Sequence, residues 1–203
     1  MNNKRNNEFV ILNFLAKNSR NETDKLFTML QLSKETKIPY ATFYRTILKI
    51  NNLVNVQVIG KSKIVSLNKD NPIIKSYLSI SSDDEKNNFL KKNPIINNIY
   101  SELETKDIII LFGSQAKGTQ RENSDIDLLI INKKGNKSIS FSKYETLFKK
   151  KINPIFVTYE EFKQMLNEKS ENVGKQALKN HIILNNPENF WECVLNGGIQ
   201  KRI

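Results

Sequence analysis

Apolar residues recur at helical spacing along the first part of the chain. Residues 8–17 carry such a stripe and are predicted to form a helix. A second helix is predicted from Phe27 to Lys37, because Pro39 disfavours a helical conformation of the residue before it. A third helix is predicted from Tyr40 to about Asn51, with Pro39 suited to its first turn. The stripe of this third helix that is predicted to face the core consists of Phe43, Ile47 and Ile50.

After Leu53 the apolar period changes from helical to alternating. Val54, Val56 and Val58 are predicted to point to one face of a strand, and Val65 and Leu67 to continue that face after a turn at Gly60-Lys61-Ser62. This pattern indicates a β-hairpin. Three helices followed by a hairpin with a basic tip is the order of elements in a winged helix-turn-helix.

Residues 71–95 are predicted to form an ordered helical connector. Asn71-Pro72 and Asn93-Pro94 each place a capping side chain before a proline at a first helical position. Ser82 and Glu85 have the spacing of a capping box.

From Asp107 onward the pattern is that of an α/β domain. Strands are predicted at residues 108–112, 125–131 and 152–158, with a helix near 142–151 and a last helix from Asn186-Pro187 to Gly197-Gly198. The predicted fold class is therefore α/β (α+β). The predicted domains are a winged helix-turn-helix over 1–70, the connector over 71–95 and a second domain over 96–203.

The charge of the chain is unevenly distributed. The net charge is +11, and residues 1–75 hold 13 Lys and Arg against 5 Asp and Glu, a balance of +8. This excess would attract a polyanion, and double-stranded DNA is the expected partner. No apolar run approaches the roughly 18 residues of a membrane span, and no signal-peptide core is present, so we expect no membrane contact and a cytoplasmic location. A single cysteine and a single histidine exclude an intramolecular disulfide and a Cys/His zinc site.

A glycine turn and two aspartates carry the candidate chemistry. A predicted buried strand ends at Gly113-Ser114, where a phosphate can approach the backbone and the N–H groups of a following short helix. Asp125 and Asp127 follow at positions i and i+2 of a strand, which sends both side chains to one face. Two such carboxylates beside a phosphate site can share a magnesium ion with a triphosphate.

This segment resembles the minimal nucleotidyltransferases related to DNA polymerase beta, and the resemblance covers about residues 96–203. It implies a mixed sheet flanked by helices, a nucleoside triphosphate substrate and Mg²⁺ or Mn²⁺ as cofactor. Asp125 and Asp127 would be the catalytic metal ligands, and Ser114 would touch a phosphate. The predicted nucleotide-binding residues are Gly113, Ser114, Gly118 and Ser124.

The chain departs from this family at one position. The family carries a third carboxylate on the next strand, and Asn153 stands where that acid would align. Asparagine offers a carbonyl oxygen to a metal, but it adds no negative charge and accepts no proton as a base. Glu160 and Glu161 are alternatives, although they lie near the start of a helix.

The first part of the chain resembles a winged helix domain, so the whole resembles the archaeal type in which such a domain precedes a minimal nucleotidyltransferase. The second helix of the motif would enter the major groove, and the hairpin tip would meet phosphates or the minor groove. The residues predicted to contact DNA are Tyr40, Thr42, Tyr44, Arg45, Lys61 and Lys63.

Two functions remain open at this point. The first is magnesium-dependent transfer of a nucleoside monophosphate from a triphosphate to a hydroxyl on a protein, a nucleic acid or a small molecule. The second is a DNA-binding transcriptional regulator or antitoxin-like protein whose nucleotidyltransferase domain turns over slowly or not at all. Winged helices also serve as protein-binding modules, and assembly as a homodimer is left open.

Overall fold

The computed structural model describes residues 6–18 and 26–196. The chain divides into two compact units, and the boundary lies between Ser81 and Ser82. The division into 1–70, 71–95 and 96–203 stays a prediction. In the described residues, no helix is long and apolar enough to cross a membrane.

The first unit begins with three helices and a short strand, namely α1 (Asn7–Asn18), β1 (Phe27–Thr28), α2 (Met29–Glu35) and α3 (Tyr40–Lys49). The predicted helix start at Phe27 is wrong, because Phe27 pairs with a strand of the hairpin. Thr28 then caps α2: its hydroxyl accepts a hydrogen bond from the Gln31 N–H, and the Gln31 side chain accepts one from the Thr28 N–H. The predicted apolar stripe of α3 is buried, with each of its three residues at most 2% exposed.

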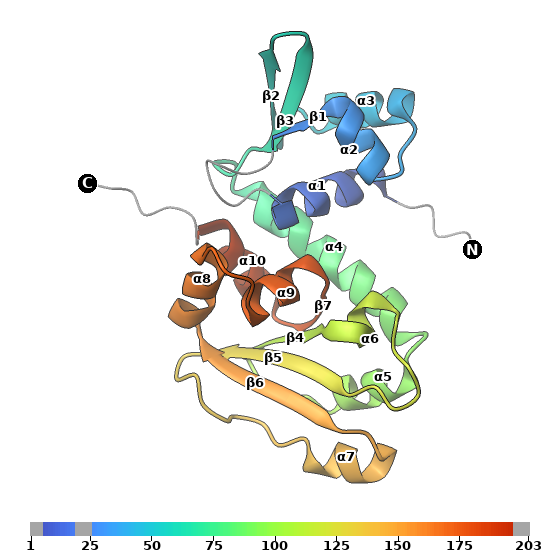
Figure 1. The fold of residues 1–203 in the computed structure, drawn as a ribbon, viewed down its shortest axis with the longest axis vertical. Helices are drawn as coiled ribbons and strands as arrows, with labels where there is room; N and C mark the ends of the chain where they lie inside the picture. The colour runs from blue at the N-terminus through green and yellow to red at the C-terminus, as the bar shows by residue number, and fades with distance from the viewer. Residues whose placement is uncertain (1–5, 19–25, 197–203) are drawn as a thin grey trace. The chain divides into compact units, whose positions relative to one another are not determined.

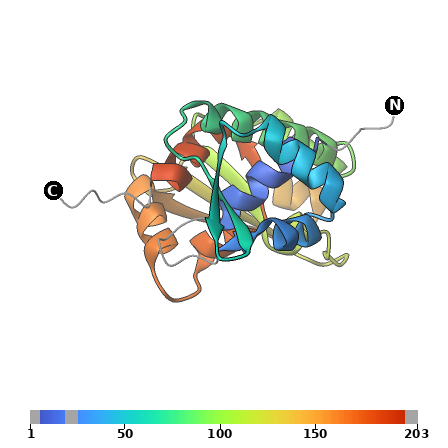
Figure 2. The ribbon, with the colours of Figure 1, turned by 90° about the horizontal axis from the view of Figure 1, so that it is seen from above.

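The hairpin consists of β2 (Val54–Ile59) and β3 (Ser62–Leu67), in an antiparallel sheet of order β1-β3-β2. Gly60 has φ +59°, as a first position of a two-residue hairpin turn requires. The expected apolar face is buried only at its base: Val54 is 3% exposed, but Val56 is 43% and Val58 is 71% exposed. The physical reason is that β3 contacts α1 and α2, whereas the outer part of the ribbon projects beyond the helices (Figures 1 and 2).

The predicted connector contains α4 (Ile73–Leu90) and the start of α5 (Pro94–Ser101). The Asn71 side chain accepts the Ile73 N–H at 3.0 Å, so this cap is confirmed. The prediction of a capping box at Ser82 is wrong, because α4 continues through Ser82 and Glu85 without a break. The Ser82 hydroxyl instead accepts a hydrogen bond from the indole of Trp191. The prediction that the Asn93 side chain caps α5 is also wrong, because this side chain donates a hydrogen bond to the Phe89 carbonyl instead.

The second unit contains a four-stranded mixed sheet. Its strands are β4 (Ile108–Phe112), β5 (Ile126–Asn132), β6 (Ile152–Thr158) and β7 (Ile182–Asn185), in the order β6-β5-β4-β7. The β5–β6 pair is parallel, and both neighbours of β4 are antiparallel to it. The expected mixed sheet with helices is confirmed. The strand β7 was not predicted, and β5 begins one residue later than expected.

Helices cover both faces of this sheet. Besides α5, the helices of this unit are α6 (Gly113–Lys117), α7 (Ser142–Phe148), α8 (Tyr159–Asn167), α9 (Val173–Lys179) and α10 (Pro187–Asn196). The helices α8, α9 and α10 contact one face, and α5 and α7 pack on the other (Figure 1). The last helix begins as predicted at Pro187, and its expected end at Gly197-Gly198 lies outside the described residues.

Candidate active site

Strand pairing brings the glycine turn, the aspartates and Asn153 to one end of the sheet. Phe112, the last residue of β4, is the antiparallel partner of Asp127, and Asp127 is the parallel partner of Asn153. Ile126 and Leu128 belong to the core beneath α5 and α7. Because side chains alternate along a strand, Asp127 points to the opposite face, which α8, α9 and α10 cover.

Asn153 joins the two carboxylates. Its side-chain nitrogen donates to Oδ2 of Asp125 at 3.1 Å and to Oδ1 of Asp127 at 3.2 Å. Both carboxylates therefore lie on one face within reach of a single amide, and each keeps a second oxygen that this amide does not engage. Asn153, for which the resemblance predicted an acid, thus donates hydrogen bonds to both aspartates.

Gly113 lies directly against Asp127. A Cβ atom added to Gly113 would lie 2.3 Å from Oδ2 of Asp127, closer than real Cβ atoms come to any neighbour. Gly113 also has φ +71°, in the left-handed region that favours glycine. Two independent constraints thus require glycine where the backbone passes the carboxylate.

The other three predicted nucleotide-binding residues lie in α6 and in the loop after it. Ser114 is half-buried, and its hydroxyl has no hydrogen-bond partner among residues 6–18 and 26–196. Gly118 ends α6 with φ +69°, and its N–H donates to the Gln115 carbonyl. The Ser124 hydroxyl accepts the Arg121 N–H at 2.8 Å, so it stabilises the turn that leads into the aspartates.

Glu160 and Glu161 do not supply the third carboxylate. Glu161 lies at the N-terminus of α8, where its side chain accepts the Thr158 N–H at 2.7 Å as part of a capping box. Over the part of the chain that the structure describes, no group of three or more His, Cys, Asp or Glu residues could hold a metal ion. Asn153 therefore lies beside the two aspartates in place of a third carboxylate.

A basic cavity of about 350 Å³ adjoins the glycine turn, and α9 forms part of its wall. Lys117 and Lys179 line it together with Gly113. Lys179 is paired with Glu171 at 3.0 Å, whereas the ammonium of Lys117 makes no hydrogen bond or ion pair within the described ranges. The sequence analysis did not name either lysine as a candidate: Lys117 lies in the short helix predicted after Gly113, and Lys179 lies in α9, which was not predicted.

The residues predicted to contact DNA all belong to the first unit. Tyr40, Arg45, Lys61 and Lys63 are exposed, and Thr42 and Tyr44 are half-buried. The ammonium of Lys63 lies 5.4 Å from the centre of the Tyr44 ring, so the hairpin and α3 present these two residues together. Arg45 uses its Nε to donate to the Ala41 carbonyl. Whether any of them contacts DNA stays a prediction.

A comparison with known protein families matches most of the second unit. A family model described as "Nucleotidyltransferase domain" matches residues 94–184, which contain the glycine turn, both aspartates and Asn153. No curated protein matches the chain. One similar solved structure is described as "Crystal structure of the toxin-antitoxin with AMP-PNP" and is 17% identical. The match covers 51% of this chain and 82% of that chain, with a TM-score of 0.36.

Proposed function

We propose that this protein transfers a nucleoside monophosphate from a nucleoside triphosphate to a hydroxyl group, at the site formed by Gly113, Asp125 and Asp127. The proposal depends on one observation above all: two carboxylates on one sheet face, joined by Asn153, with Oδ2 of Asp127 against the backbone of Gly113. The match of residues 94–184 to a nucleotidyltransferase family supports it.

The acid pair fits a divalent cation. Mg²⁺ prefers oxygen ligands and is commonly held by one or two carboxylates together with substrate phosphates, so a complete protein cage is not required. Asp125 and Asp127 would hold the ion through the oxygens that Asn153 does not engage. When bound, the ion supplies positive charge that polarises the phosphoryl group under attack. Mn²⁺ shares the preference for carboxylate ligands.

The chemistry proposed for the site is a single substitution at phosphorus. The acceptor oxygen forms a bond to the α-phosphorus, the bond from that phosphorus to the α–β bridging oxygen breaks, and pyrophosphate leaves. The acceptor proton passes to solvent water, because Asn153 cannot act as a base and the oxygens of Asp125 and Asp127 are engaged by Asn153 and by the ion. Lys117 and Lys179 would lie beside the departing phosphates and offset their charge.

Incubation with labelled ATP, CTP, GTP or UTP in Mg²⁺ or Mn²⁺ tests the transfer. The expected result is release of pyrophosphate and appearance of label on a protein, nucleic-acid or small-molecule acceptor. Nucleotide that binds in a metal-dependent way but stays entirely triphosphate would remove the transferase proposal. It would favour the second candidate, a regulator with a nucleotide-binding but inactive domain.

Asn153 is the observation that favours the second candidate, and it gives a prediction. We expect Asn153→Asp to lower the melting temperature in EDTA, because three carboxylates then face one another without the bridging amide. We expect Mg²⁺ to stabilise this variant more than the wild-type chain, because added negative charge strengthens the site. Thermal melts with and without Mg²⁺ measure both effects, and Glu104→Gln, an exposed acid, is the control.

The transfer rate of the same variant separates the two candidates. If the wild-type chain is a slow transferase, Asn153→Asp transfers faster. If the domain serves only to bind nucleotide, the variant binds metal more tightly and transfers nothing.

We further propose that residues 1–70 form a winged helix-turn-helix that binds double-stranded DNA. The order of three helices and a hairpin, the balance of +8 in residues 1–75, and the exposure of Arg45, Lys61 and Lys63 support this. In this arrangement α3 would enter the major groove. Lys63, which lies beside Tyr44, would extend the DNA-contacting surface of α3.

We expect Arg45→Ala to weaken binding to the DNA upstream of the protein's own gene by about tenfold, because one guanidinium contact is lost. A matched control is Lys106→Ala, which removes one positive charge from an exposed position in the other unit. Gel shifts at several salt concentrations provide the measurement. An Arg45→Ala variant that binds as the wild-type chain does, or a wild-type chain that binds no DNA at low salt, would instead favour a protein-binding module.

A further inference from the structure

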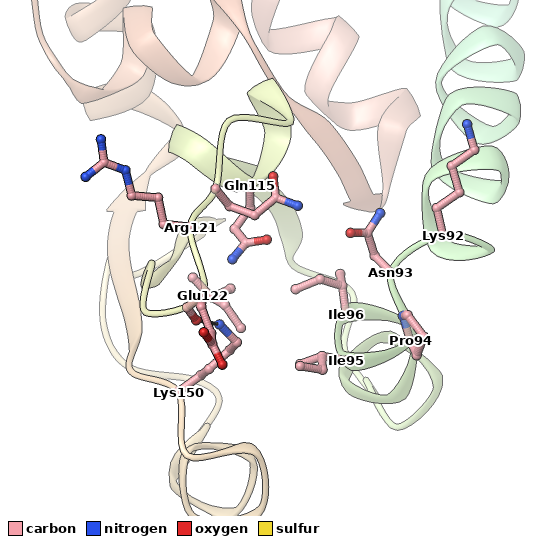
Figure 3. Close-up of a pocket in the computed structure, with 11 residues that line it drawn as sticks. Lys92, Asn93, Pro94, Ile95, Ile96, Gln115, Arg121, Glu122 and Lys150 are labelled. Carbon is pink, nitrogen blue, oxygen red and sulfur yellow. Dashed lines mark hydrogen bonds between the residues drawn. The ribbon is translucent and has the colours of Figure 1, made fainter.

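A cavity of about 360 Å³ beside α6 does not gather its charged side chains around one point. Figure 3 shows Lys92 and Arg121 on opposite sides of it with their charged ends directed outward, and Glu122 also lines it. This mixed rim favours no particular ligand. The outer edge of the hairpin in the first unit is a surface with a more definite chemistry.

The strand β2 is an open edge of its sheet. Over the described residues the sheet order is β1-β3-β2, so β2 pairs with β3 alone. Ile59 and Ser62 flank a two-residue turn, and the two residues in this position of a hairpin form a hydrogen-bonded pair. Because such pairs alternate with non-hydrogen-bonded ones, the backbone N–H and C=O groups of Val54, Val56 and Val58 point away from β3. A further strand can pair with these groups.

This edge lacks the features by which proteins usually prevent pairing between sheet edges, namely charged side chains, prolines and bulges. Residues 50–60 contain no charged residue and no proline. The register between β2 and β3 is continuous, without a bulge. Val56, Val58 and Ile59 are 43%, 71% and 52% exposed. An uncharged, regular and partly apolar edge of this kind is suited to a partner strand.

The sequence of the edge is complementary to itself. In an antiparallel pair centred on Val56, this residue lies opposite Val56 of a second copy, Val54 lies opposite Val58, and Asn55 lies opposite Gln57. Valines then face valines and amides face amides, which are favourable cross-strand pairs. The outward-pointing backbone groups of the valines meet their counterparts across a twofold axis, as an isologous interface requires.

The distribution of charge agrees with a second copy as the partner. The chain has a net charge of +11, so like charges oppose contact between two copies over much of the surface. In the register centred on Val56, the uncharged residues 50–60 face themselves, and Lys61 at the tip faces Asn51 of the second copy. No like charges are opposed along the paired strands, and this segment offers no charge that would attract an acidic or a basic partner.

We propose that two copies of this chain associate through β2, so that their hairpins form one continuous antiparallel sheet across a twofold axis. Lys63 belongs to β3, which is not the paired edge, so the two hairpins keep this basic side chain outside the interface. The proposal does not rest on the proposed transfer or on DNA binding. An interface of one strand from each copy is below the standard size, so the dimer is expected to dissociate at roughly 10–100 µM.

Sedimentation of the full-length chain over a concentration series across this range tests the proposal. We expect the mass to rise from that of a monomer to that of a dimer. Val58→Lys should raise the dissociation constant about tenfold or more, because it places a charge on the paired edge. The matched control is Ser62→Lys, which adds the same charge at an exposed position of the same hairpin, but on β3. It should dimerise nearly as the wild-type chain does.

Val56→Cys tests the register. Directly opposed residues of a hydrogen-bonded antiparallel pair have Cα atoms about 5.5 Å apart, a distance that a disulfide spans. Mild oxidation should therefore join two copies of this variant. Gln57→Cys changes the next residue, which is exposed and in this register lies about 7–8 Å from its counterpart, too far for a disulfide. The natural Cys193 is buried, so the wild-type chain should not be joined.

Three results would overturn the proposal. The first is a wild-type chain that stays monomeric throughout the series, which would leave the edge to a strand of another protein. The second is a Val58→Lys variant that dimerises as the wild-type chain does. The third is oxidation that joins Gln57→Cys as readily as Val56→Cys.

Discussion

Replacement of Asp127 by asparagine is expected to lower metal-dependent affinity for nucleoside triphosphate by about a thousandfold and to abolish detectable transfer. The reason is the charge: two unit charges 4 Å apart interact with about 4 kcal/mol at an effective dielectric of 20, which is about a thousandfold in affinity. The shape changes little, since asparagine has nearly the volume of aspartate and can still accept from Asn153. Titration with a labelled triphosphate in Mg²⁺ and in EDTA is the measurement.

The melting temperature in EDTA shows whether this loss is local. We expect Asp127→Asn to melt no lower than the wild-type chain, because it removes one of two like charges that share the Asn153 amide. Glu104→Gln removes an exposed carboxylate from the same unit and should leave nucleotide binding unchanged. If Asp127→Asn binds and transfers as the wild-type chain does, the acid pair is not the active site.

Replacement of Gly113 by alanine is expected to lower transfer by about a hundredfold or more. The added methyl group would lie 2.3 Å from Oδ2 of Asp127, so the carboxylate or the turn must move. A displacement of about 1 Å in an active site can cost about a hundredfold in rate. Transfer assays under saturating metal and nucleotide measure the effect.

Gly60→Ala is the matched control for this prediction. Gly60 has φ +59° and Gly113 has φ +71°, so alanine at either position carries left-handed strain of about 1–2 kcal/mol. A Cβ atom at Gly60 would meet no atom within 4 Å. We therefore expect Gly60→Ala to lose stability but keep the transfer rate, whereas Gly113→Ala loses both. Equal activity in the two variants would show that the contact with Asp127 has no role in the reaction.

Part of the candidate site could be predicted from short stretches of the sequence. The apolar run before Gly113 and the i, i+2 spacing of Asp125 and Asp127 placed the glycine at a strand end and both acids on one face, as the structure has them. These features depend on backbone geometry over a few residues. The role of Asn153 depends instead on the parallel register that pairs it with Asp127 across 26 positions of the chain.

Other parts of the site and the fold were not predictable for related reasons. The run Ile182–Asn185 is too short for its period to distinguish a strand from a helix, and only its pairing with β4 makes it β7. Lys179 reaches the glycine turn because α9 packs against β4. Val56 and Val58 alternate correctly, yet they are exposed because none of the helices that the structure describes in the first unit covers the outer hairpin.

The sequence by itself determined the three helices and the hairpin of the first unit, the strands β4, β5 and β6, the tight turn at Gly113 and the common direction of the two carboxylates. Each of these follows from steric limits on neighbouring residues. Tertiary structure alone decided which side chains surround the acids: an amide instead of a third carboxylate, and two lysines beside the turn. These neighbours depend on strand register and on helix packing between segments that are far apart in the sequence. A pattern within a few residues cannot predict such long-range contacts.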